Sequence, residues 1–392
     1  MNILFITKNF YIGGISIVTA YLANKFHQAG HNVAIWSFTR TEISSQDRLD
    51  NNIKIEYGYG LRHSIKNIKS LRTAIIDNKT DIVINQTGLN FFWAYTIKKA
   101  TKGLYVKLIS VYHSDPSTNS RIQSVDIDIA KTSSSFKLYY LKIKRYLYKA
   151  ITATSMRYVF YNSDIFVLLS KSFINGFKEF TGVKDTRKIR TITNPITIDT
   201  TKYIYEMEKK QKEVVYVGRL EPNIKRVHRV LETWRLVEKK HLDWTLRIVG
   251  DGNERKELER LIDHYSLRKV RLEGFNDPRP YYEKASVLLL TSEYEGFGLV
   301  IVEGMSFGVV PIALGSYSAV HDIIEDGKDG NIVPYCKKKG FIAKDMAQKL
   351  EFLMNNDDKR NEMALAAIEK SKKFSIETVY KKWEELLLNL RS

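Results

Sequence analysis

Short apolar runs alternate with helix-length segments over almost the whole chain. Each run has four to eight residues, a length typical of strands that are buried on both faces. The runs lie at 2–7, 31–38, 81–85, 105–112, 165–169 and 188–193, and then at 213–217, 244–249, 270–273, 287–290 and 309–314. This alternation is typical of βαβ units and predicts an α/β protein built on parallel sheets.

The series of runs is interrupted near Asn194–Pro195, and the following stretch, 197–212, is polar and charged. Proline cannot continue a strand ladder and forces the preceding residue towards an extended conformation. The chain has 392 residues, whereas a single domain usually has roughly 100–200. We therefore expect two doubly wound domains, 1–196 and 197–374, and a final helix over 375–392 that begins with the N-cap residue Ser375.

The positive charge of the chain is concentrated in its first half. The whole sequence has 62 Lys and Arg against 44 Asp and Glu, a formal charge of +18. Residues 1–200 hold 28 of these cations and 13 of these anions (+15), and residues 201–392 hold 34 and 31 (+3). Such asymmetry indicates an anionic partner, for which nucleic acid, anionic lipid and a phosphorylated substrate are the candidates.

The segment Ile129–Asn162 contains no acidic residue. Its cations are Lys131, Lys137, Lys142, Lys144, Arg145, Lys149 and Arg157. Its aromatic residues are Phe136, Tyr139, Tyr140, Tyr146, Tyr148, Tyr158, Phe160 and Tyr161. Two interpretations stay open: the segment lies on anionic lipid with its rings among the headgroups, or a long helix packs its rings into the domain.

Other features limit the location of the protein. No apolar run approaches the roughly 20 residues of a membrane-spanning helix, and the start MNILFITKNF does not have the pattern of a secretory signal. The single cysteine, Cys336, excludes a disulfide framework and fits a reducing compartment. We expect a cytoplasmic protein, either free or peripheral on the inner face of the cytoplasmic membrane.

Two loops of the second half follow strands, and one of them carries side chains suited to a phosphorylated ligand. Arg219 and Lys225 follow the strand that ends at Val217, and ligands of open α/β sheets bind beyond the carboxyl ends of strands. These two cations are suited to grip a diphosphate, although two solvated cations would give the same pattern. The glycines of the other loop, GDG at 250–252, indicate only a strand-to-helix turn.

The segment 295–305 is the strongest functional candidate. A flexible turn from Glu295 to Gly298 leads into an apolar helix that begins at Leu299. The backbone N–H groups of Gly298, Leu299 and Val300 would form an anion site at the helix start. Glu303 lies inside this apolar helix, where a carboxylate is costly unless it is paired or bonded to ligand hydroxyls.

In the first half, Gly14 follows the first strand and His113 follows the strand 105–112. For each, an ordinary structural role remains open. The chain has no zinc-binding His–Glu pattern, P-loop, nucleophile elbow or complete Gly-x-Gly-x-x-Gly after the first strand. These absences argue against a metalloprotease, an NTPase, an α/β-hydrolase and a typical dehydrogenase.

Taken together, the motifs resemble those of retaining glycosyltransferases of family four, which have the GT-B fold. The resemblance rests on Gly-Arg-Leu…Lys at 218–225, IVGDG at 248–252, LEGF at 272–275 and two glutamates with seven residues between them, Glu295 and Glu303. It covers essentially the whole chain and implies two Rossmann-like domains facing a central cleft. It also implies that the helix over 375–392 packs back on the first domain.

For the donor, the resemblance implies one role for each matching residue. Arg219 and Lys225 would neutralise a nucleotide diphosphate, and Glu303 would hold the ribose hydroxyls. Glu295 would contact hydroxyls of the transferred sugar, while Phe275 would lie near the base. The backbone of Gly298, Leu299 and Val300 would bind phosphates or sugar.

For the acceptor side, the resemblance implies that Gly14 allows close approach and that His113 contacts the sugar. No metal and no cofactor are expected. The implied activity is retaining transfer of a hexose or N-acetylhexosamine from a nucleotide-diphosphate sugar to a saccharide, with a lipid-linked acceptor of O-antigen, capsule or lipopolysaccharide synthesis. An anionic membrane surface would bind the basic half, and nucleic acid is not expected as a partner. The alternatives are a GT-B-fold epimerase and a non-catalytic subunit that binds nucleotide sugar or lipid.

Overall fold

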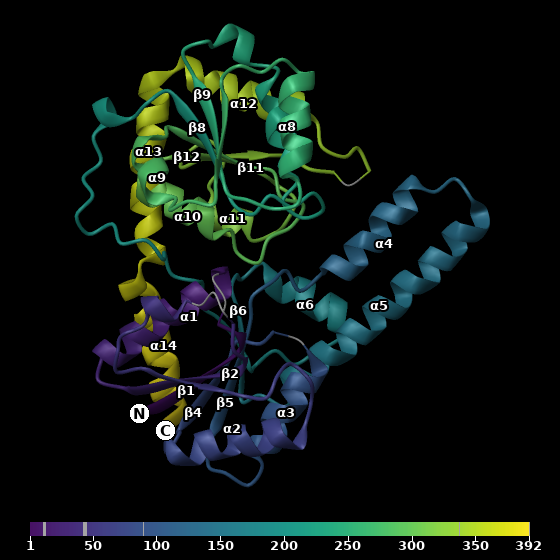
Figure 1. Cartoon of the computed structure of the whole chain (residues 1–392), viewed down its shortest axis with the longest axis vertical. Coiled ribbons are helices and arrows are strands. Elements are labelled where there is room, and N and C mark those ends of the chain that lie inside the picture. The colour runs from purple at the N-terminus through teal and green to yellow at the C-terminus, as the bar shows by residue number, and fades with distance from the viewer. Residues whose placement is uncertain (11–12, 42–44, 89, 337, 392) are drawn as a thin grey trace. The chain divides into compact units, whose positions relative to one another are not determined.

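The computed structural model describes residues 1–10, 13–41, 45–88, 90–336 and 338–391. The chain divides into two compact units. Unit 1 comprises Met1–Thr197 together with Ile376–Ser392, and unit 2 comprises Ile198–Ser375. Each unit is an α/β domain with its own sheet (Figure 1).

Unit 1 has a parallel sheet with the strand order β3-β2-β1-β4-β5-β6-β7 over its described residues. The strands are β1 (Asn2–Asn9), β2 (Asn32–Thr39), β3 (Lys54–Tyr57), β4 (Ile82–Asn85), β5 (Lys107–Tyr112), β6 (Ile165–Leu168) and β7 (Ile189–Thr191). In the register of the central strands, Phe5 lies opposite Ile35 on one side and Ile84 on the other.

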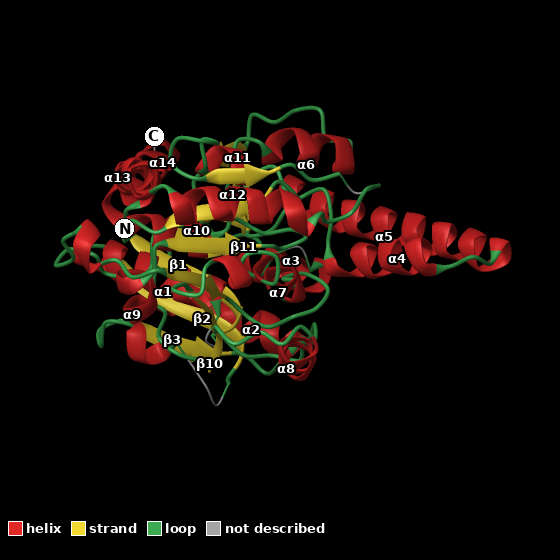
Figure 2. Ribbon diagram, turned by 90° about the horizontal axis from the view of Figure 1, so that it is seen from above, coloured by secondary structure: helices red, strands yellow, loops and turns green. Residues whose placement is uncertain are grey.

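The helices of unit 1 are α1 (Gly14–Gln28), α2 (Ile65–Asp77), α3 (Phe91–Thr101), α4 (Ser120–Lys131), α5 (Ser135–Tyr161), α6 (Phe173–Thr181) and α14 (Ile376–Arg391). The last of these follows unit 2 in the chain but packs on α1. There the ring of Phe26 contacts those of Tyr380 and Trp383, with centroid distances of 5.3 and 6.2 Å. Helices α4 and α5 lie side by side and project from the sheet of unit 1 (Figures 1 and 2).

Unit 2 has a second parallel sheet, with the order β10-β9-β8-β11-β12-β13 in the described chain. Its strands are β8 (Glu213–Val217), β9 (Thr245–Val249), β10 (Val270–Gly274), β11 (Val287–Leu290), β12 (Val310–Leu314) and β13 (Asn331–Val333). Its helices are α7 (His228–Trp234), α8 (Arg255–His264), α9 (Arg279–Lys284), α10 (Leu299–Ser306), α11 (Val320–Ile323), α12 (Ala343–Asn355) and α13 (Asp357–Ser371).

The strands form where the apolar runs lie, because helices on both faces of each sheet exclude water from them. All four residues of β11 are buried, and so are Val214–Tyr216 of β8. The large rings of Trp234 and Trp244 complete the core of unit 2. The predicted fold class, two doubly wound α/β domains, is confirmed by the two parallel sheets.

Candidate functional site

The carboxyl ends of β8, β9 and β11 lie at one edge of the sheet in unit 2, because these strands are parallel neighbours. The loops predicted to bind ligand leave the sheet at this edge. Here β8 continues into the loop that holds Arg219 and Lys225, and β11 continues into the loop that holds Glu295. Ligands of such sheets bind at this edge.

An ion pair joins the two loops. Lys225 Nζ lies 2.5 Å from Glu295 Oε1, and the two side chains are 20% and 12% exposed. Ser292 Oγ donates a hydrogen bond of 2.6 Å to the same carboxylate oxygen. The structure thus brings together a cation and a carboxylate that lie 70 residues apart in the sequence. Such a charge-assisted contact fixes the position of both groups.

The backbone beside Lys225 is held by side chains from the end of β11. Arg226 has a φ of +54°, a left-handed conformation that is costly for a residue with a side chain. Thr291 Oγ1 donates to the carbonyl oxygens of Lys225 and Arg226, at 3.3 and 3.1 Å. The N–H of Glu293 donates to the carbonyl of Ile224 at 2.7 Å. The conformation of the Lys225 loop is therefore tied to the strand that leads to Glu295.

Glu293 is a second acidic residue of this loop, and the sequence did not single it out. Its carboxylate accepts hydrogen bonds from Arg229 Nη2 at 2.8 Å and from the Tyr335 hydroxyl at 2.6 Å. Arg226 Nε lies 3.6 Å from it. The Arg229 side chain is only 7% exposed, so its charge depends on this partner. A signal was present in the sequence, because Glu293 lies two residues before Glu295.

The helix α10 begins at the predicted position, Leu299. Its N-cap, Gly298, has a φ of +95°, and a Cβ there would lie 2.7 Å from the Tyr317 hydroxyl. A glycine is therefore needed at this point. Leu299 and Val300 are partly exposed, and the first N–H groups of a helix have no partner within the helix. This N-terminus follows Glu295 directly and suits an anionic group.

Two buried polar residues lie at this helix, Tyr317 beside its N-terminus and Glu303 within it. Burial raises the pKa of Tyr317 well above its ordinary value, and the negative charge of Glu295 adds to the effect. The hydroxyl of Tyr317 has no hydrogen-bond partner among the described residues. Glu303, the fifth residue of α10, is only 7% exposed. Burial raises the pKa of the nearby Tyr282, and the charge of Glu303 raises it further.

Arg219 and Phe275 do not join the Lys225–Glu295 pair. The Arg219 side chain is exposed and forms no ion pair with a carboxylate of the described chain. Phe275 follows β10, and its ring is 75% exposed. By contrast, packing explains the first glycine of the GDG loop: a Cβ at Gly250 would lie 1.9 Å from the carbonyl oxygen of Gly218.

In unit 1, three adjacent strands, β1, β4 and β5, end beside one another. Gly14 follows β1 as the first residue of α1, Gln86 follows β4, and His113 follows β5. His113 Nε2 is hydrogen-bonded to Gln86 Oε1. The sequence predicted His113 and Gly14 but not Gln86, whose position beside His113 depends on the order of the strands.

His113 is held in its neutral form. Burial lowers its pKa to about 4, so the imidazole is uncharged at neutral pH. Its Nδ1 and the Nε2 of Gln86 are buried and have no hydrogen-bond partner among the described residues. Buried polar atoms are nearly always hydrogen-bonded, so each of these two atoms keeps an unused capacity for a hydrogen bond.

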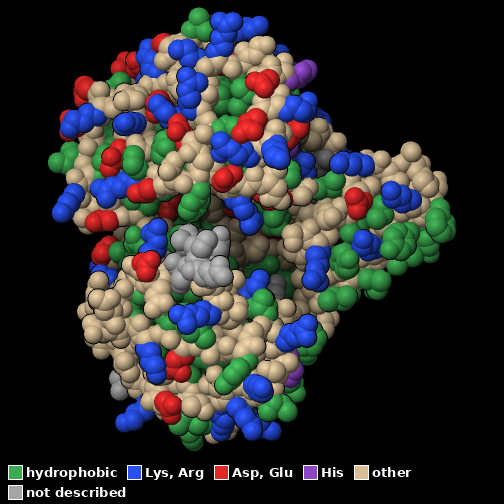
Figure 3. All heavy atoms as spheres, in the orientation of Figure 1, with side chains coloured by type: hydrophobic (Ala, Val, Ile, Leu, Met, Phe, Trp, Pro, Cys, Tyr) green, Lys and Arg blue, Asp and Glu red, His purple; other side chains and the backbone are tan. Residues whose placement is uncertain are grey.

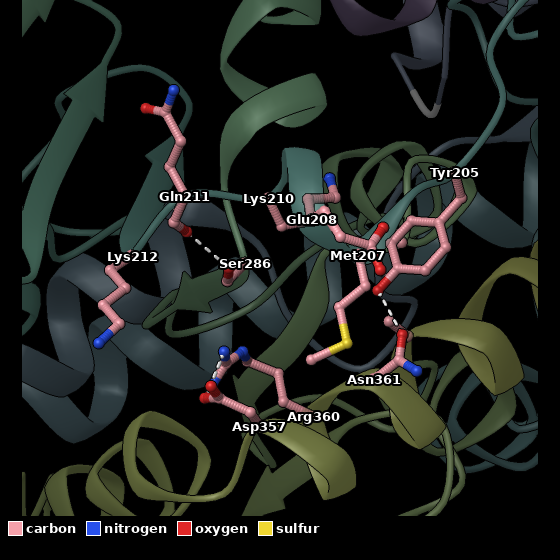
Figure 4. Close-up of a pocket in the computed structure, with 12 residues that line it drawn as sticks. Tyr205, Met207, Glu208, Lys210, Gln211, Lys212, Ser286, Asp357, Arg360 and Asn361 are labelled. Atoms are coloured by element: carbon pink, nitrogen blue, oxygen red, sulfur yellow. Dashed lines mark hydrogen bonds and ion pairs between the residues drawn. The ribbon is translucent and has the colours of Figure 1, made fainter.

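Unit 2 also has a cavity of about 290 Å³ at the opposite edge of its sheet, lined by Lys212 and Ser286 just before β8 and β11 (Figure 4). None of the predicted site residues lines it. Burial lowers the pKa of Lys210 in its wall to about 7, and this ammonium group donates to the carbonyl of Tyr282 at 2.8 Å. Because it lies at the amino ends of the strands, this cavity is not the candidate site.

The described residues contain no group of three or more His, Cys, Asp or Glu placed to hold a metal ion. Within the same residues, no helix combines the length and the apolar character needed to cross a membrane.

Two family profiles match the chain. The profile described as "Glycosyl transferases group 1" matches residues 198–370, and the profile described as "Glycosyltransferase Family 4" matches residues 12–200. Between them they cover unit 2 and the first part of unit 1 almost completely.

Curated relatives agree with these profiles. Over 181 residues, which are 46% of its length, this chain is 33% identical to the amylovoran biosynthesis glycosyltransferase AmsD of Erwinia amylovora. The chain is also 25% identical to an α-1,4-N-acetyl-D-galactosaminyltransferase of Campylobacter jejuni, which is named for an undecaprenol-linked saccharide. This alignment covers 100% of this chain and 99% of the relative. The first curated relatives are matched over only about half of their own length, 56% and 49%.

Solved structures show the same fold. The structure of Anabaena HepE in complex with UDP and glucose aligns with 99% of this chain and 100% of its own, at a TM-score of 0.76 and 17% identity. Such an alignment at low identity supports the fold, while the two profiles identify the family. The chain belongs to the group 1 glycosyltransferases and has their GT-B fold.

Proposed function

We propose that this glycosyltransferase moves a hexose or N-acetylhexosamine from a nucleotide-diphosphate sugar to a lipid-linked saccharide, with retention of the anomeric configuration. The product would be part of an O-antigen, a capsule or a lipopolysaccharide core, made at the inner face of the cytoplasmic membrane. The observation that carries the proposal is the Lys225–Glu295 ion pair beside the N-terminus of α10.

On the donor side, the charged residues of the candidate site in unit 2 would each contact one part of the nucleotide sugar. Lys225, fixed by Glu295, would hold the diphosphate together with the N–H groups of Gly298, Leu299 and Val300. Glu295 would also accept a hydrogen bond from a hydroxyl of the transferred sugar. The exposed Arg219 has the freedom to turn onto the phosphates, and Phe275 would cover the base.

Glu303 would bind the ribose hydroxyls of the donor. The carboxylate is 7% exposed and belongs to an apolar helix, and two neighbouring hydroxyl groups can donate to one carboxylate without adding charge. The HepE structure contains UDP and glucose, which supports a uridine nucleotide as the first donor to test.

On the acceptor side, Gly14, Gln86 and His113 would bind a saccharide. A neutral imidazole with an unpartnered Nδ1 accepts a hydrogen bond from a hydroxyl. The names of three relatives support a growing surface polymer as acceptor: the amylovoran enzyme, the undecaprenol-linked enzyme of Campylobacter jejuni and a poly(ribitol-phosphate) α-N-acetylglucosaminyltransferase of Staphylococcus aureus.

In the proposed reaction, the acceptor hydroxyl forms a new bond to the anomeric carbon, and the bond from that carbon to the diphosphate breaks. The hydroxyl proton passes to the leaving phosphate oxygen on the same face of the sugar, so no protein base is required. Lys225 and the N-terminus of α10 stabilise the negative charge that develops on the leaving nucleotide.

The test is a panel of nucleotide sugars with lipid-linked acceptors, read as release of free nucleotide and as the anomeric configuration of the product. We expect turnover with one donor, an α-linked product from an α-linked donor, and turnover lowered by about 10²–10³-fold in Lys225→Ala. A matched control is Lys256→Ala, an exposed lysine of α8. Conversion of the donor to its epimer without an acceptor would instead identify an epimerase, and donor binding without turnover would identify a non-catalytic subunit.

A further inference from the structure

The helix α5 exposes an apolar face over its first four turns. The residues on this face are between 45% and 84% exposed: Phe136, Tyr139, Tyr140, Ile143, Tyr146 and Leu147. Their spacing of three and four residues places them on one side of a helix with about 3.6 residues per turn. Figure 3 shows hydrophobic side chains gathered along the free edge of the α4–α5 projection, with Lys and Arg between them.

The opposite side of α5 is the packed one. Leu141 and Met156 are buried there, and Arg145 Nε lies 2.5 Å from Asp126 Oδ1 of α4. Farther along, Phe160 packs against Phe166 and Phe177 in the body of unit 1. The aromatic residues therefore divide into two groups, and only those near the end of the helix serve the core.

Lysines border the exposed face on both sides. At 100° per residue, Lys142 and Lys149 lie along one border of the apolar face, and Lys137 and Lys144 lie along the other. No acidic residue occurs between Ile129 and Asn162. An apolar face between two rows of cations is the pattern of a helix that lies in the plane of an anionic membrane surface.

We propose that the exposed face of α5 docks on an anionic lipid bilayer. The rings enter the boundary between headgroups and acyl chains, and the four lysines reach the lipid phosphates on either side. The helix lies on the membrane and does not cross it, in keeping with its charged borders. This inference stands on the surface of unit 1 and does not depend on the transfer reaction proposed above.

Charge favours a bilayer over a second copy of the chain. Two copies joined through this face would bring eight lysines together, while the same segments offer no carboxylate to pair with them. Like charges placed together at an interface oppose association. Anionic headgroups complement the same lysines.

Docking in this way would also serve the site of unit 1. Helix α4 begins at Ser120, seven residues after His113. A membrane under α5 would thus hold the short segment between His113 and α4 close to lipid-borne substrates.

The first test is co-sedimentation of the full chain with vesicles of 30% phosphatidylglycerol and 70% phosphatidylcholine, at 50 and 500 mM NaCl. We expect binding at low salt, much weaker binding at high salt, and little binding to pure phosphatidylcholine. Substituting Lys137→Gln, Lys142→Gln, Lys144→Gln and Lys149→Gln together should lower the partition coefficient by roughly 100-fold. The matched control removes four exposed lysines of unit 2, by Lys239→Gln, Lys256→Gln, Lys284→Gln and Lys344→Gln, and should retain most of the binding.

A second test locates the contact. In a Cys336→Ser background, an environment-sensitive dye attached at Tyr140→Cys should shift to shorter wavelength on these vesicles, and a dye at Lys69→Cys on α2 should not. Equal shifts at both positions, or equal losses of binding in the two lysine variants, would overturn the proposal. So would self-association through this face, seen by sedimentation velocity as a dimer that Tyr140→Ser with Leu147→Ser dissolves while vesicles remain unbound.

Discussion

The carboxyl ends of the two sheets differ in the contacts that hold their polar groups. In unit 2 two ion pairs lie there, Lys225 with Glu295 and Arg229 with Glu293, beside the hydroxyl of Tyr317, which has no partner among the described residues. In unit 1 the corresponding edge has a neutral histidine, and both His113 Nδ1 and Gln86 Nε2 have no partner in the described chain.

The difference shows how the two halves prepare for their ligands. Paired charges hold a binding geometry before the ligand arrives, which is what electrostatic stabilisation of a leaving group requires. Unpartnered polar atoms cost free energy in the empty protein, and a ligand that satisfies them recovers this cost.

The largest effect is expected when the Lys225–Glu295 ion pair of unit 2 is removed. Lys225→Ala should lower kcat/KM for the donor by about 10²–10³-fold, because it removes a fixed positive charge from the leaving diphosphate. Nucleotide release measures it. Lys256→Ala should leave the rate within twofold. A Lys225→Ala enzyme that is as fast as this control would show that the Lys225–Glu295 pair is not part of the active site.

Next in size is the loss of the second pair. Glu293→Ala should lower the free energy of unfolding by about 3–5 kcal/mol, because it leaves the buried guanidinium of Arg229 without a carboxylate. Urea unfolding monitors the change. Glu257→Ala is the matched control: its partner, Arg260, is 62% exposed, and no measurable loss is expected because water screens this pair. Similar losses in both variants would mean that burial of the Arg229 pair is energetically unimportant.

The neutral histidine of unit 1 should appear as a pH dependence of stability. The pKa of His113 is about 4 in the folded chain, against an ordinary value of 6.5, so between these values the unfolded chain binds more protons. The contribution is complete above pH 6.5 and is lost as pH falls to 4, up to about 3 kcal/mol. Urea unfolding from pH 4 to 7 tests it: His113→Gln should flatten the profile, and His264→Gln, at an exposed position, should not. Parallel profiles would show that His113 titrates normally.

The smallest effect compares two tyrosines of unit 2. Tyr317→Phe should change the free energy of unfolding by less than about 1 kcal/mol, because the hydroxyl has no partner among the described residues. Tyr335→Phe should cost about 1.5–3 kcal/mol, because its hydroxyl donates to the Glu293 carboxylate at 2.6 Å. Thermal unfolding of both variants measures the difference. An equal cost would show that Tyr317 is hydrogen-bonded after all.

Much of the fold could be predicted because strands buried on both faces require continuous apolar runs. One strand outside the predicted runs, β3 (Lys54–Tyr57), lies at the sheet edge and reads KIEY, with two charged residues that an edge strand tolerates. The start of α10 was predicted because the glycine-rich turn before Leu299 separates a buried strand from an apolar helix.

The site was harder to predict because its contacts join distant segments. The contact of Gln86 with His113 exists only because β4 and β5 are neighbours in the sheet, and the sequence does not state that order. Arg229 and Glu293 are separated by 64 residues. For α5 the spacing of aromatic residues indicates two apolar sides, and tertiary packing decides which of them is buried.

The position of α14 has a consequence for synthesis of the chain. Val379 and Trp383 of this helix are buried in unit 1, against Phe26, yet the ribosome makes them only after all of unit 2. Unit 1 must therefore wait for this last segment with part of its apolar surface exposed. A chain truncated before Ile376 would hold every segment of unit 2 but an incomplete unit 1, and the incomplete unit is where chaperones would bind.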